Sequence, residues 1–91
     1  MAELNVEIVA EDHFVWSGPA KSVSARTVEG DIGILPGHTP LLAVLAGDGP
    51  LIVEPVEGAP IKATVEGGFF SVDSDRVVIV ADNAQLDSSV S

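Results

Sequence analysis

The chain has 91 residues, of which 14 are acidic and 4 are basic, giving a formal net charge of −10. This length suits one domain with one core, and a hydrophobic content of 46% indicates a globular chain rather than a disordered one. The acidic balance argues against nucleic acid and anionic lipid as partners, because both require a basic face, and it favours a partner with a basic patch.

Two further absences narrow the class of protein. The sequence contains no cysteine, so it has neither disulfides nor thiolate metal sites and is compatible with a reducing compartment. No apolar run approaches the roughly 20 residues of a membrane span, and the N-terminal "MAELNVEIVAED" lacks the basic start and apolar core of a signal peptide. We therefore expect a cytosolic chain that reaches a membrane complex only through a protein partner.

The first third of the chain alternates between apolar and polar residues. In "ELNVEIVA", residues 3–10, the apolar side chains fall at every second position, which is typical of a half-buried strand. Residues 13–18 predict a short extended segment that ends at a break formed by Gly18 and Pro19, and residues 20–28 alternate again.

The middle of the chain predicts two more strands. "DIGILP", residues 31–36, is short, whereas "LLAVLA", residues 41–46, is continuously apolar and predicts a strand covered on both faces. Its core positions would be Leu41, Val44 and Leu45. Truncating one of these side chains to alanine is expected to cost about 2–5 kcal/mol.

Turn residues divide the second half into further strands. Pro55 favours an edge position for the first of them, Gly67 and Gly68 predict a bulge or bend, and residues 73–75 predict a hairpin turn. The last stretch, "DNAQLDSSVS", is polar and holds at most the start of a helix near Ala84. The expected strands are residues 51–56, 61–66, 69–72 and 76–81.

Short strands separated by frequent turn signals are typical of an antiparallel sandwich or barrel. No window predicts a helix that could stand alone, since isolated helices need roughly 12–15 residues. The residues alone therefore predict an all-β domain with no substantial helix.

The stretch "GDIGILPGHTPLLAVL", residues 30–45, raises the question of a phosphate loop. Its glycines match neither the dinucleotide pattern nor the Walker pattern, the segment behind them predicts a strand rather than a helix N-terminus, and Glu29 and Asp31 would repel an anion. A nucleotide site is therefore disfavoured. Pro36 and Gly37 instead suit the central positions of a type II turn, where glycine supplies the positive φ.

The other candidate sites are weak. His13 and His38 are the only histidines and lie far apart in sequence, so a metal site with three or four ligands is not expected; we expect His38 to bond local backbone at a corner or to contact a partner. Asp73 and Asp75 lack the glycine and closing glutamate of a calcium loop, and no serine sits in a G-x-S-x-G elbow. The residues support no enzyme, metal or cofactor, and describe a domain whose role is contact.

Several motifs together carry a resemblance to a known family. "GDIGILPGHTPLL" resembles the signature segment of the epsilon subunit of F-type ATP synthases, while "LNVEIVAEDHFVWSGPAKSVSARTVEG", "VEGGFFSV" and "RVVIVADNA" resemble its N-terminal strands, its Gly-Gly strand and its last strand. The resemblance covers residues 3–86. It implies a β-sandwich domain of about ten antiparallel strands, a flattened barrel, over residues 1–86, followed by a polar tail over residues 87–91.

The resemblance also implies a function. Such a chain is a non-catalytic subunit in the central stalk of a proton-translocating rotary synthase, where it links the gamma subunit to the polar loops of the membrane c-ring and couples rotation to ATP synthesis. It would be peripheral on the cytoplasmic side of the cell membrane, with no direct membrane insertion.

The family's contact positions transfer to this sequence residue by residue. Ile32 would be an apolar anchor between two glycines, and the acidic residues beside it would face cationic groups of the ring. The positions that match the c-ring loop are Glu29, Gly30, Asp31, Ile32 and Gly33. The positions that match the side facing gamma are Ala10, His38, Thr39, Leu42 and Ala43.

The sequence departs from the family pattern at its C-terminus. Typical members continue into a two-helix hairpin, which in some bacteria binds ATP and blocks hydrolysis, whereas this sequence ends at Ser91. We therefore expect a short form, natural or truncated, that does not bind ATP.

Two other classes of protein were weighed against the family. A biotinyl- or lipoyl-type carrier domain is also a small acidic β-sandwich, but it displays a lysine at a hairpin tip, and neither Lys21 nor Lys62 is expected at one. A small cupin-like metalloenzyme would need a cluster of His and Glu that two separated histidines cannot supply.

Overall fold

The structure, a computed structural model, describes residues 3–11, 13–47 and 49–86 of the chain. In these residues every regular element is a strand, as the sequence predicts, and nine strands are present where the resemblance implies about ten. The described part holds no helix long and apolar enough to cross a bilayer. The strands are β1 (Leu4–Ala10), β2 (His13–Thr27), β3 (Gly30–Ile34), β4 (Leu41–Val44), β5 (Gly49–Pro55), β6 (Ile61–Glu66), β7 (Phe69–Asp73), β8 (Arg76–Ala81) and β9 (Asn83–Leu86).

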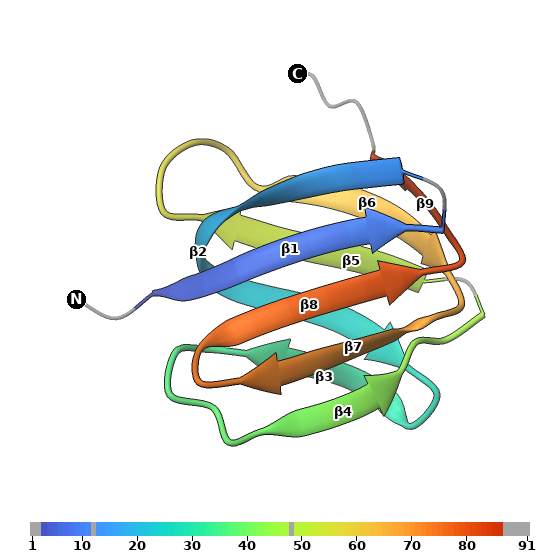
Figure 1. The fold of residues 1–91 in the computed structure, drawn as a ribbon, viewed down its shortest axis with the longest axis horizontal. Helices are drawn as coiled ribbons and strands as arrows, with labels where there is room; N and C mark the ends of the chain where they lie inside the picture. Colours follow the sequence, from blue (N-terminus) through green and yellow to red (C-terminus); the bar gives the residue numbers. More distant parts are fainter. Residues whose placement is uncertain (1–2, 12, 48, 87–91) are drawn as a thin grey trace.

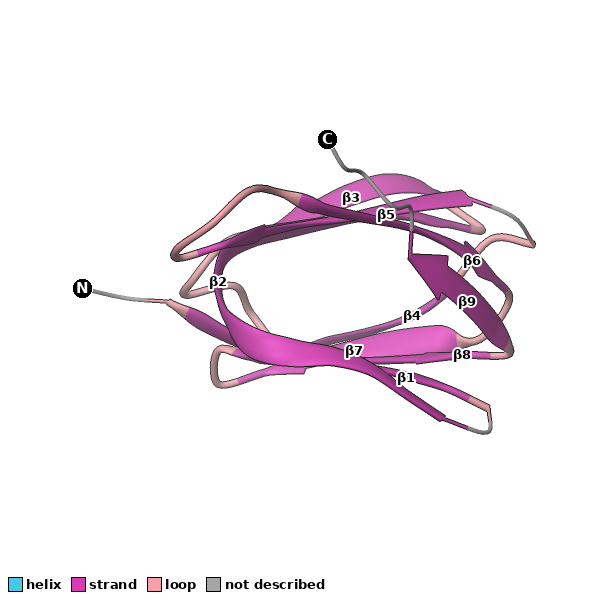
Figure 2. Ribbon diagram, turned by 90° about the horizontal axis from the view of Figure 1, so that it is seen from above, coloured by secondary structure: helices cyan, strands magenta, loops and turns pink. Residues whose placement is uncertain are grey.

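A single hydrogen-bonded path joins the strands in the order β4-β7-β8-β1-β2-β5-β6-β9, with β3 attached to β2. The path folds over on itself, so that β4, β7, β8 and β1 form a first layer and β3, β5 and β6 form a second layer, with β9 at its edge (Figures 1 and 2). Strand β2 belongs to both layers, because its first half pairs with β1 and its second half with β3 and β5. The predicted β-sandwich is confirmed.

One pairing departs from the antiparallel prediction. Strands β1 and β8 run parallel, with Asn5 opposite Arg76 and Ala10 opposite Ala81. Parallel neighbours need a long connection between them, and here strands β2 to β7 supply it. The pairing places the first strand of the chain and one of its last in the middle of the first layer.

The core lies between the two layers and is almost entirely aliphatic. Inward side chains alternate with outward ones, and in β1 the inward residues Leu4, Val6 and Ile8 are at most 3% exposed. With one aromatic ring among the largest buried side chains, the packing rests on branched aliphatic residues that suit a pleated surface. The largest fully buried side chains are those of Phe70, Leu4, Ile8, Ile34, Leu51, Ile79, Val23, Val53, Val65 and Val77.

Strand β2 contradicts the predicted break at Gly18 and Pro19, because it continues through both residues. The physical reason lies in its neighbours. Pairing with β1 extends to Ala20, and pairing with β5 begins at the same residue, opposite Pro55, with an irregular register just beyond it. Pro19 therefore lies where β2 has a paired strand on one side only, which is a position that tolerates a missing N–H.

Strand β4 contradicts the prediction of a strand covered on both faces. It is four residues long, it ends the sheet path, and its exposure alternates. Leu42 is 70% exposed and Val44 is 54% exposed, so Val44 is not a core residue. Leu45, just past the strand, is buried as predicted, and Leu41 is half-buried against the core.

Both turns predicted from residue chemistry are confirmed. At the corner after β3, Gly37 has a φ of 89° and His38 donates its backbone N–H to the carbonyl oxygen of Leu35 at 3.2 Å, as a type II turn requires. The hairpin between β7 and β8 turns at Ser74 and Asp75, whose φ values of 53° and 65° are both positive, as in a type I′ turn.

The predicted bend at Gly67 and Gly68 carries the chain from β6 in the second layer to β7 in the first. Gly68 has a φ of 102°, and a Cβ atom there would collide with the carbonyl oxygen of Val80. Gly67 donates its N–H to the carbonyl oxygen of Ala46 at 3.1 Å. The bend therefore requires glycine for both its conformation and its close packing.

Two predictions in the last half of the chain are wrong. Ala84 does not begin a helix; it lies in β9 and pairs with Val65 of β6, a non-local contact that local propensity cannot reveal. Strand β5 is not an edge strand, since it lies between β2 and β6, and Pro55 is its last residue, beyond the last pair with β6. The predicted polar tail, residues 87–91, lies outside the described residues.

We expect Leu45→Ala to lower the free energy of unfolding by about 2–5 kcal/mol, because it leaves a cavity in the core. Leu42→Ala is the matched control: the same change at a side chain that is 70% exposed should stay within about 0.5 kcal/mol. Urea denaturation of the two variants measures the difference. Equal losses would show that the two leucines are not on opposite faces of the layer.

Gly68→Ala should destabilise the domain by about 3 kcal/mol or more, because the methyl group meets backbone and the residue must keep a positive φ. Gly33→Ala is the control, since a Cβ atom at Gly33 meets nothing within 4 Å, and it should change stability by less than about 1 kcal/mol. Thermal unfolding followed by circular dichroism compares them. A Gly68 variant that melts together with the Gly33 variant would contradict the bend geometry.

Candidate functional site

The residues matched to the c-ring loop do not form a loop throughout. Val28 and Glu29 make the turn between β2 and β3, whereas Gly30, Asp31, Ile32 and Gly33 belong to β3 and pair with β2. Strand β3 forms because it pairs with the preceding strand β2 across this tight turn, in agreement with the strand predicted from residue 31 onward. The exposed tip is therefore shorter than predicted.

Thr27 fixes the conformation of that turn. Its hydroxyl donates a hydrogen bond to the carbonyl oxygen of Gly30 at 2.7 Å and accepts one from the backbone N–H of Glu29 at 3.1 Å. Thr27 itself is 8% exposed. A buried threonine that bonds both sides of the turn gives the tip a defined shape.

Two of the three residues expected to engage the ring directly, Asp31 and Ile32, are partly engaged within the chain. The carboxylate of Asp31 lies 3.1 Å from Nε of Arg26, in an exposed ion pair that contributes little to stability. Ile32 is half-buried and packs against the core, so it does not project as an anchor. The apolar side chain presented at the tip is that of Val28, which is 64% exposed and which the sequence reasoning missed.

The residues matched to the gamma-facing side are spread over three places. His38 and Thr39 lie in the corner between β3 and β4, where Nδ1 of His38 is 2.7 Å from the carbonyl oxygen of Thr39, as expected for a histidine at a corner. Leu42 faces outward from β4, while Ala43 lies opposite the buried Phe70. Ala10 is at the end of β1, three steps from β4 along the sheet path, and is 2% exposed.

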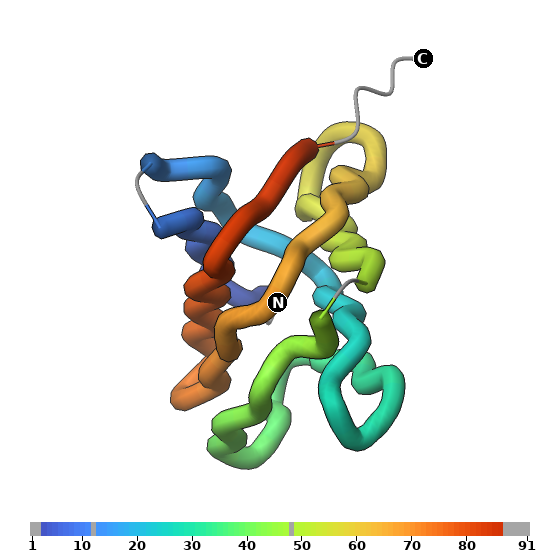
Figure 3. Tube along the Cα trace, turned by 90° about the vertical axis from the view of Figure 1, so that its right-hand side faces the viewer, coloured from blue at the N-terminus to red at the C-terminus, as the bar shows by residue number. Residues whose placement is uncertain are grey.

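The structure brings part of the two predicted sets together. The β2–β3 turn and the segment around β4 lie side by side at one end of the molecule, the lower end in Figures 1 and 3. A bond from the N–H of Val28 to the carbonyl oxygen of Val44, 3.0 Å long, ties them. Between them is a cavity of about 190 Å³, lined by Thr27, Val28, Glu29, Ile32, Leu41, Leu42, Ala43 and Val44.

The outer face of the first layer carries a continuous row of apolar side chains. Register pairs link Val44 to Phe69, Phe69 to Val80, Val80 to Val9, and Val9 to Phe14, across β4, β7, β8, β1 and β2. Val44 is 54% exposed, Phe69 46% and Phe14 60%, and the other two are half-buried. We call these five residues the apolar stripe. Exposed contiguous apolar surface on a small domain marks an interaction site.

The sequence contains a signal for the stripe. Strands such as "RVVIVA" and "LLAVLA" are apolar at outward as well as inward positions, a pattern that in "LLAVLA" predicts a strand covered on both faces. The same pattern arises when a partner molecule, rather than a second layer of the chain, covers the outward apolar side chains. Leu42 of β4 and Val78 of β8 extend the apolar surface in the neighbouring row, on either side of Ser71.

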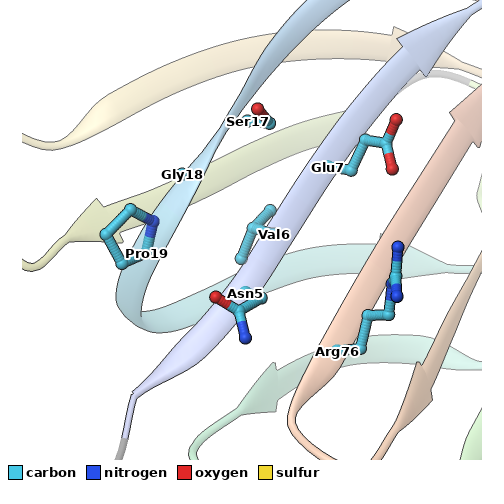
Figure 4. Close-up of a pocket in the computed structure, with 7 residues that line it drawn as sticks. All are labelled: Asn5, Val6, Glu7, Ser17, Gly18, Pro19 and Arg76. Carbon is cyan, nitrogen blue, oxygen red and sulfur yellow. The ribbon is translucent and has the colours of Figure 1, made fainter.

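The same face becomes polar toward the start of β1. There Glu7 of β1 and Arg76 of β8 stand on neighbouring strands beside Asn5 and Ser17 (Figure 4). These residues line an open groove of about 470 Å³ together with Val6, Gly18 and Pro19. The first layer therefore offers a partner an apolar region and, next to it, groups of both charges.

The outer face of the second layer differs in composition. A row across it runs from Gly33 through Ser24 and Ile52 to Lys62, so small and polar residues predominate. In the described residues no group of three or more His, Asp or Glu is placed to hold a metal ion. The apolar stripe therefore distinguishes the outer face of the first layer from that of the second.

Comparison with known proteins identifies the family. A family model described as "ATP synthase, Delta/Epsilon chain, beta-sandwich domain" matches residues 3–87. The ATP synthase epsilon chain of Micrococcus luteus is 64% identical over 86 residues, which cover 94% of this chain and 93% of the relative. That of Corynebacterium diphtheriae is 48% identical over 84 residues, which cover 92% of this chain and 68% of the relative.

Solved structures agree with the sequence comparison. The chain superimposes on one from the cryo-EM structure of Euglena gracilis mitochondrial ATP synthase, described as OSCP/F1/c-ring, with a TM-score of 0.88 and 27% identity, and it spans 57% of that chain's length. A chain from the central stalk/c-ring of Tetrahymena thermophila mitochondrial ATP synthase shares the fold, with a TM-score of 0.71 and 16% identity. With nearly the whole length matched by the family model and by close relatives, the chain belongs to the family of ATP synthase epsilon chains that carry this β-sandwich domain.

Proposed function

We propose that the chain is a non-catalytic subunit of the central stalk of a proton-translocating F-type ATP synthase, where it links the gamma subunit to the c-ring and couples rotation to ATP synthesis. It acts there as a peripheral component on the cytoplasmic side of the membrane. Family membership supports this role. The structural observation that supports the role most directly is the apolar stripe, because exposed contiguous apolar surface is stabilised when a protein partner covers it.

The apolar stripe is the proposed contact with gamma. A few large side chains near the centre of an interface supply most of its binding energy, and Phe69, between Val44 and Val80, is placed to be one of them. Leu42 extends the same surface, and His38 and Thr39 border it from the corner that leads into β4. Ala10, matched to gamma from the sequence, acts in this proposal by shaping the layer, since its side chain is buried, whereas Ala43 is half-buried and lines the cavity beside β4.

The β2–β3 turn is the proposed contact with the c-ring. Val28 supplies its exposed apolar side chain, and Glu29 beside it is exposed. A carboxylate at the edge of an interface affects the rate and orientation of association more than the final affinity. The two hydrogen bonds of the Thr27 hydroxyl hold the start of β3 behind this turn.

A part that transmits torque must resist deformation. Protein interiors packed at crystal-like density compress little, and the buried aliphatic side chains between the two layers form such an interior. Two backbone hydrogen bonds of 3.0 Å, from Val28 to Val44 and from Ala46 to Arg26, link the proposed ring contact to the strand β4 of the proposed gamma contact. The two contacts would therefore move as one body.

The alternative carrier-domain function receives no support from the positions of the lysines. A carrier lysine must be displayed at a hairpin tip, whereas Lys21 lies within β2 and Lys62 within β6. A ligase that modifies a lysine on a protruding loop would therefore not recognise Lys21 or Lys62.

We expect Val44→Asp to weaken binding of the gamma subunit by at least about 10-fold, because it places a charge on the apolar stripe, beside Phe69, where binding would remove it from water. Ser24→Asp is the control, since it adds the same charge to an exposed position on the outer face of the second layer. Both variants should fold. Isothermal titration with purified gamma measures the affinities, and equal affinities for the two variants would remove the apolar stripe from the interface.

Val28→Asp should lower proton-driven ATP synthesis several-fold in a reconstituted synthase while ATP hydrolysis by the catalytic head continues, because the change disturbs only the proposed ring contact. Val56→Asp adds the same charge to another exposed valine, in the β5–β6 connection, and should leave synthesis unchanged. Synthesis and hydrolysis rates in proteoliposomes provide the comparison. Full synthesis by the Val28 variant would exclude the turn as the coupling contact.

A further inference from the structure

One residue outside the apolar stripe and the β2–β3 turn, Asp75, bonds two distant parts of the sequence, one through its side chain and one through its backbone. Asp75, in the β7–β8 turn, accepts a hydrogen bond through Oδ1 from the backbone N–H of Gly37 at 2.7 Å. Its own carbonyl oxygen accepts one from the N–H of Asn5 at 2.8 Å. The residue thus joins the hairpin, the corner after β3 and the start of β1.

The backbone of Asp75 is in an unfavourable conformation. Its φ of 65° lies in the left-handed region, and so does the φ of 53° at Ser74, although residues other than glycine rarely adopt it. A glycine at either position would relieve this strain. The type I′ turn requires both positive φ values, and aspartate tolerates this region better than most residues, so the role of Asp75 is inferred from its long-range bond to Gly37.

The corner that Asp75 holds has few other attachments. In the described part of the chain, the other hydrogen bonds given for residues 36–40 stay within the connection: His38 N–H to Leu35 at 3.2 Å, and Nδ1 of His38 with Thr39 at 2.7 Å. The carboxylate of Asp75 is therefore the hydrogen-bonding partner that fixes this connection to the rest of the fold.

We propose that Asp75 is a positioning residue for binding of gamma: it holds the corner at Gly37, and through it His38, Thr39 and the start of β4, in the geometry that the partner recognises. The inference rests on the proposed function for the identity of the partner. A corner released from Asp75 samples other positions, and the apparent affinity falls in proportion to the fraction of molecules that remain competent.

Three variants of the hairpin separate this role from ordinary stabilisation. Asp75→Gly relieves the positive φ and removes the carboxylate. Asp75→Asn tolerates the same φ and keeps an oxygen acceptor in place. Ser74→Gly is the matched control, because it relieves strain in the same turn, while the Ser74 hydroxyl bonds only its neighbour Asp73, at 3.3 Å.

The first measurement is exchange of the Gly37 amide with water by NMR, made on the chain alone. Asp75→Gly should speed this exchange by about 10-fold, as expected when a charge-assisted hydrogen bond is lost, whereas Asp75→Asn and Ser74→Gly should leave it near the wild-type rate. If Asp75→Gly and Ser74→Gly exchange alike, the carboxylate does not hold the corner and the proposal is overturned.

The second measurement is binding to purified gamma. Asp75→Gly should bind several-fold more weakly than wild type, with Asp75→Asn restoring most of the affinity and Ser74→Gly unchanged. If Asp75→Gly speeds exchange of the Gly37 amide but binds gamma as tightly as the wild type, Asp75 only stabilises the corner, and its positioning role in binding is overturned. Failure of the wild-type chain to bind gamma would overturn the proposed function itself, and the exchange experiment would still decide whether Asp75 fixes the corner.

Discussion

Burial of one set of inward aliphatic side chains between two layers is the constraint on which the rest of the structure depends. Because strand side chains alternate, a slip of one residue in any pairing would turn these side chains outward, so the core fixes the register of the whole path. Outward positions are then free to differ between the layers. The first layer uses them for the apolar stripe, and the second layer for small and polar residues such as Ser24.

Much of the fold could be predicted from local patterns, and the errors share a cause. Alternation located β1 and β6, and turn chemistry located the type II turn at Gly37 and the hairpin that leads into β8. The break expected at Pro19, the helix start expected at Ala84 and the two-sided burial expected of Val44 are all wrong because each depends on which strand lies alongside. Neighbouring strands are chosen by non-local contacts, and a local window does not contain that information.

The candidate site was less predictable than the fold. Matching to the family identifies positions in the sequence but does not show whether each side chain points outward or into the core. It selected Leu42, which the structure exposes, and Ala10, which the structure buries. It selected Ile32 as the apolar contact at the turn, whereas the exposed apolar residue there is Val28. The apolar stripe was missed because its members come from five strands, and only the register between those strands brings them into one row.

The parallel pairing of β1 with β8 determines how late in synthesis the first layer can fold. Asn5 is synthesised near the start of the chain, and its partner Arg76 near the end, so the first layer lacks its central pairing while most of the chain emerges from the ribosome. Folds dominated by such long-range contacts form slowly, and their unpaired edges invite aggregation in the meantime. A nascent chain cannot offer its partner-binding face until Ala81 has emerged, which makes assembly with other subunits a step that follows folding.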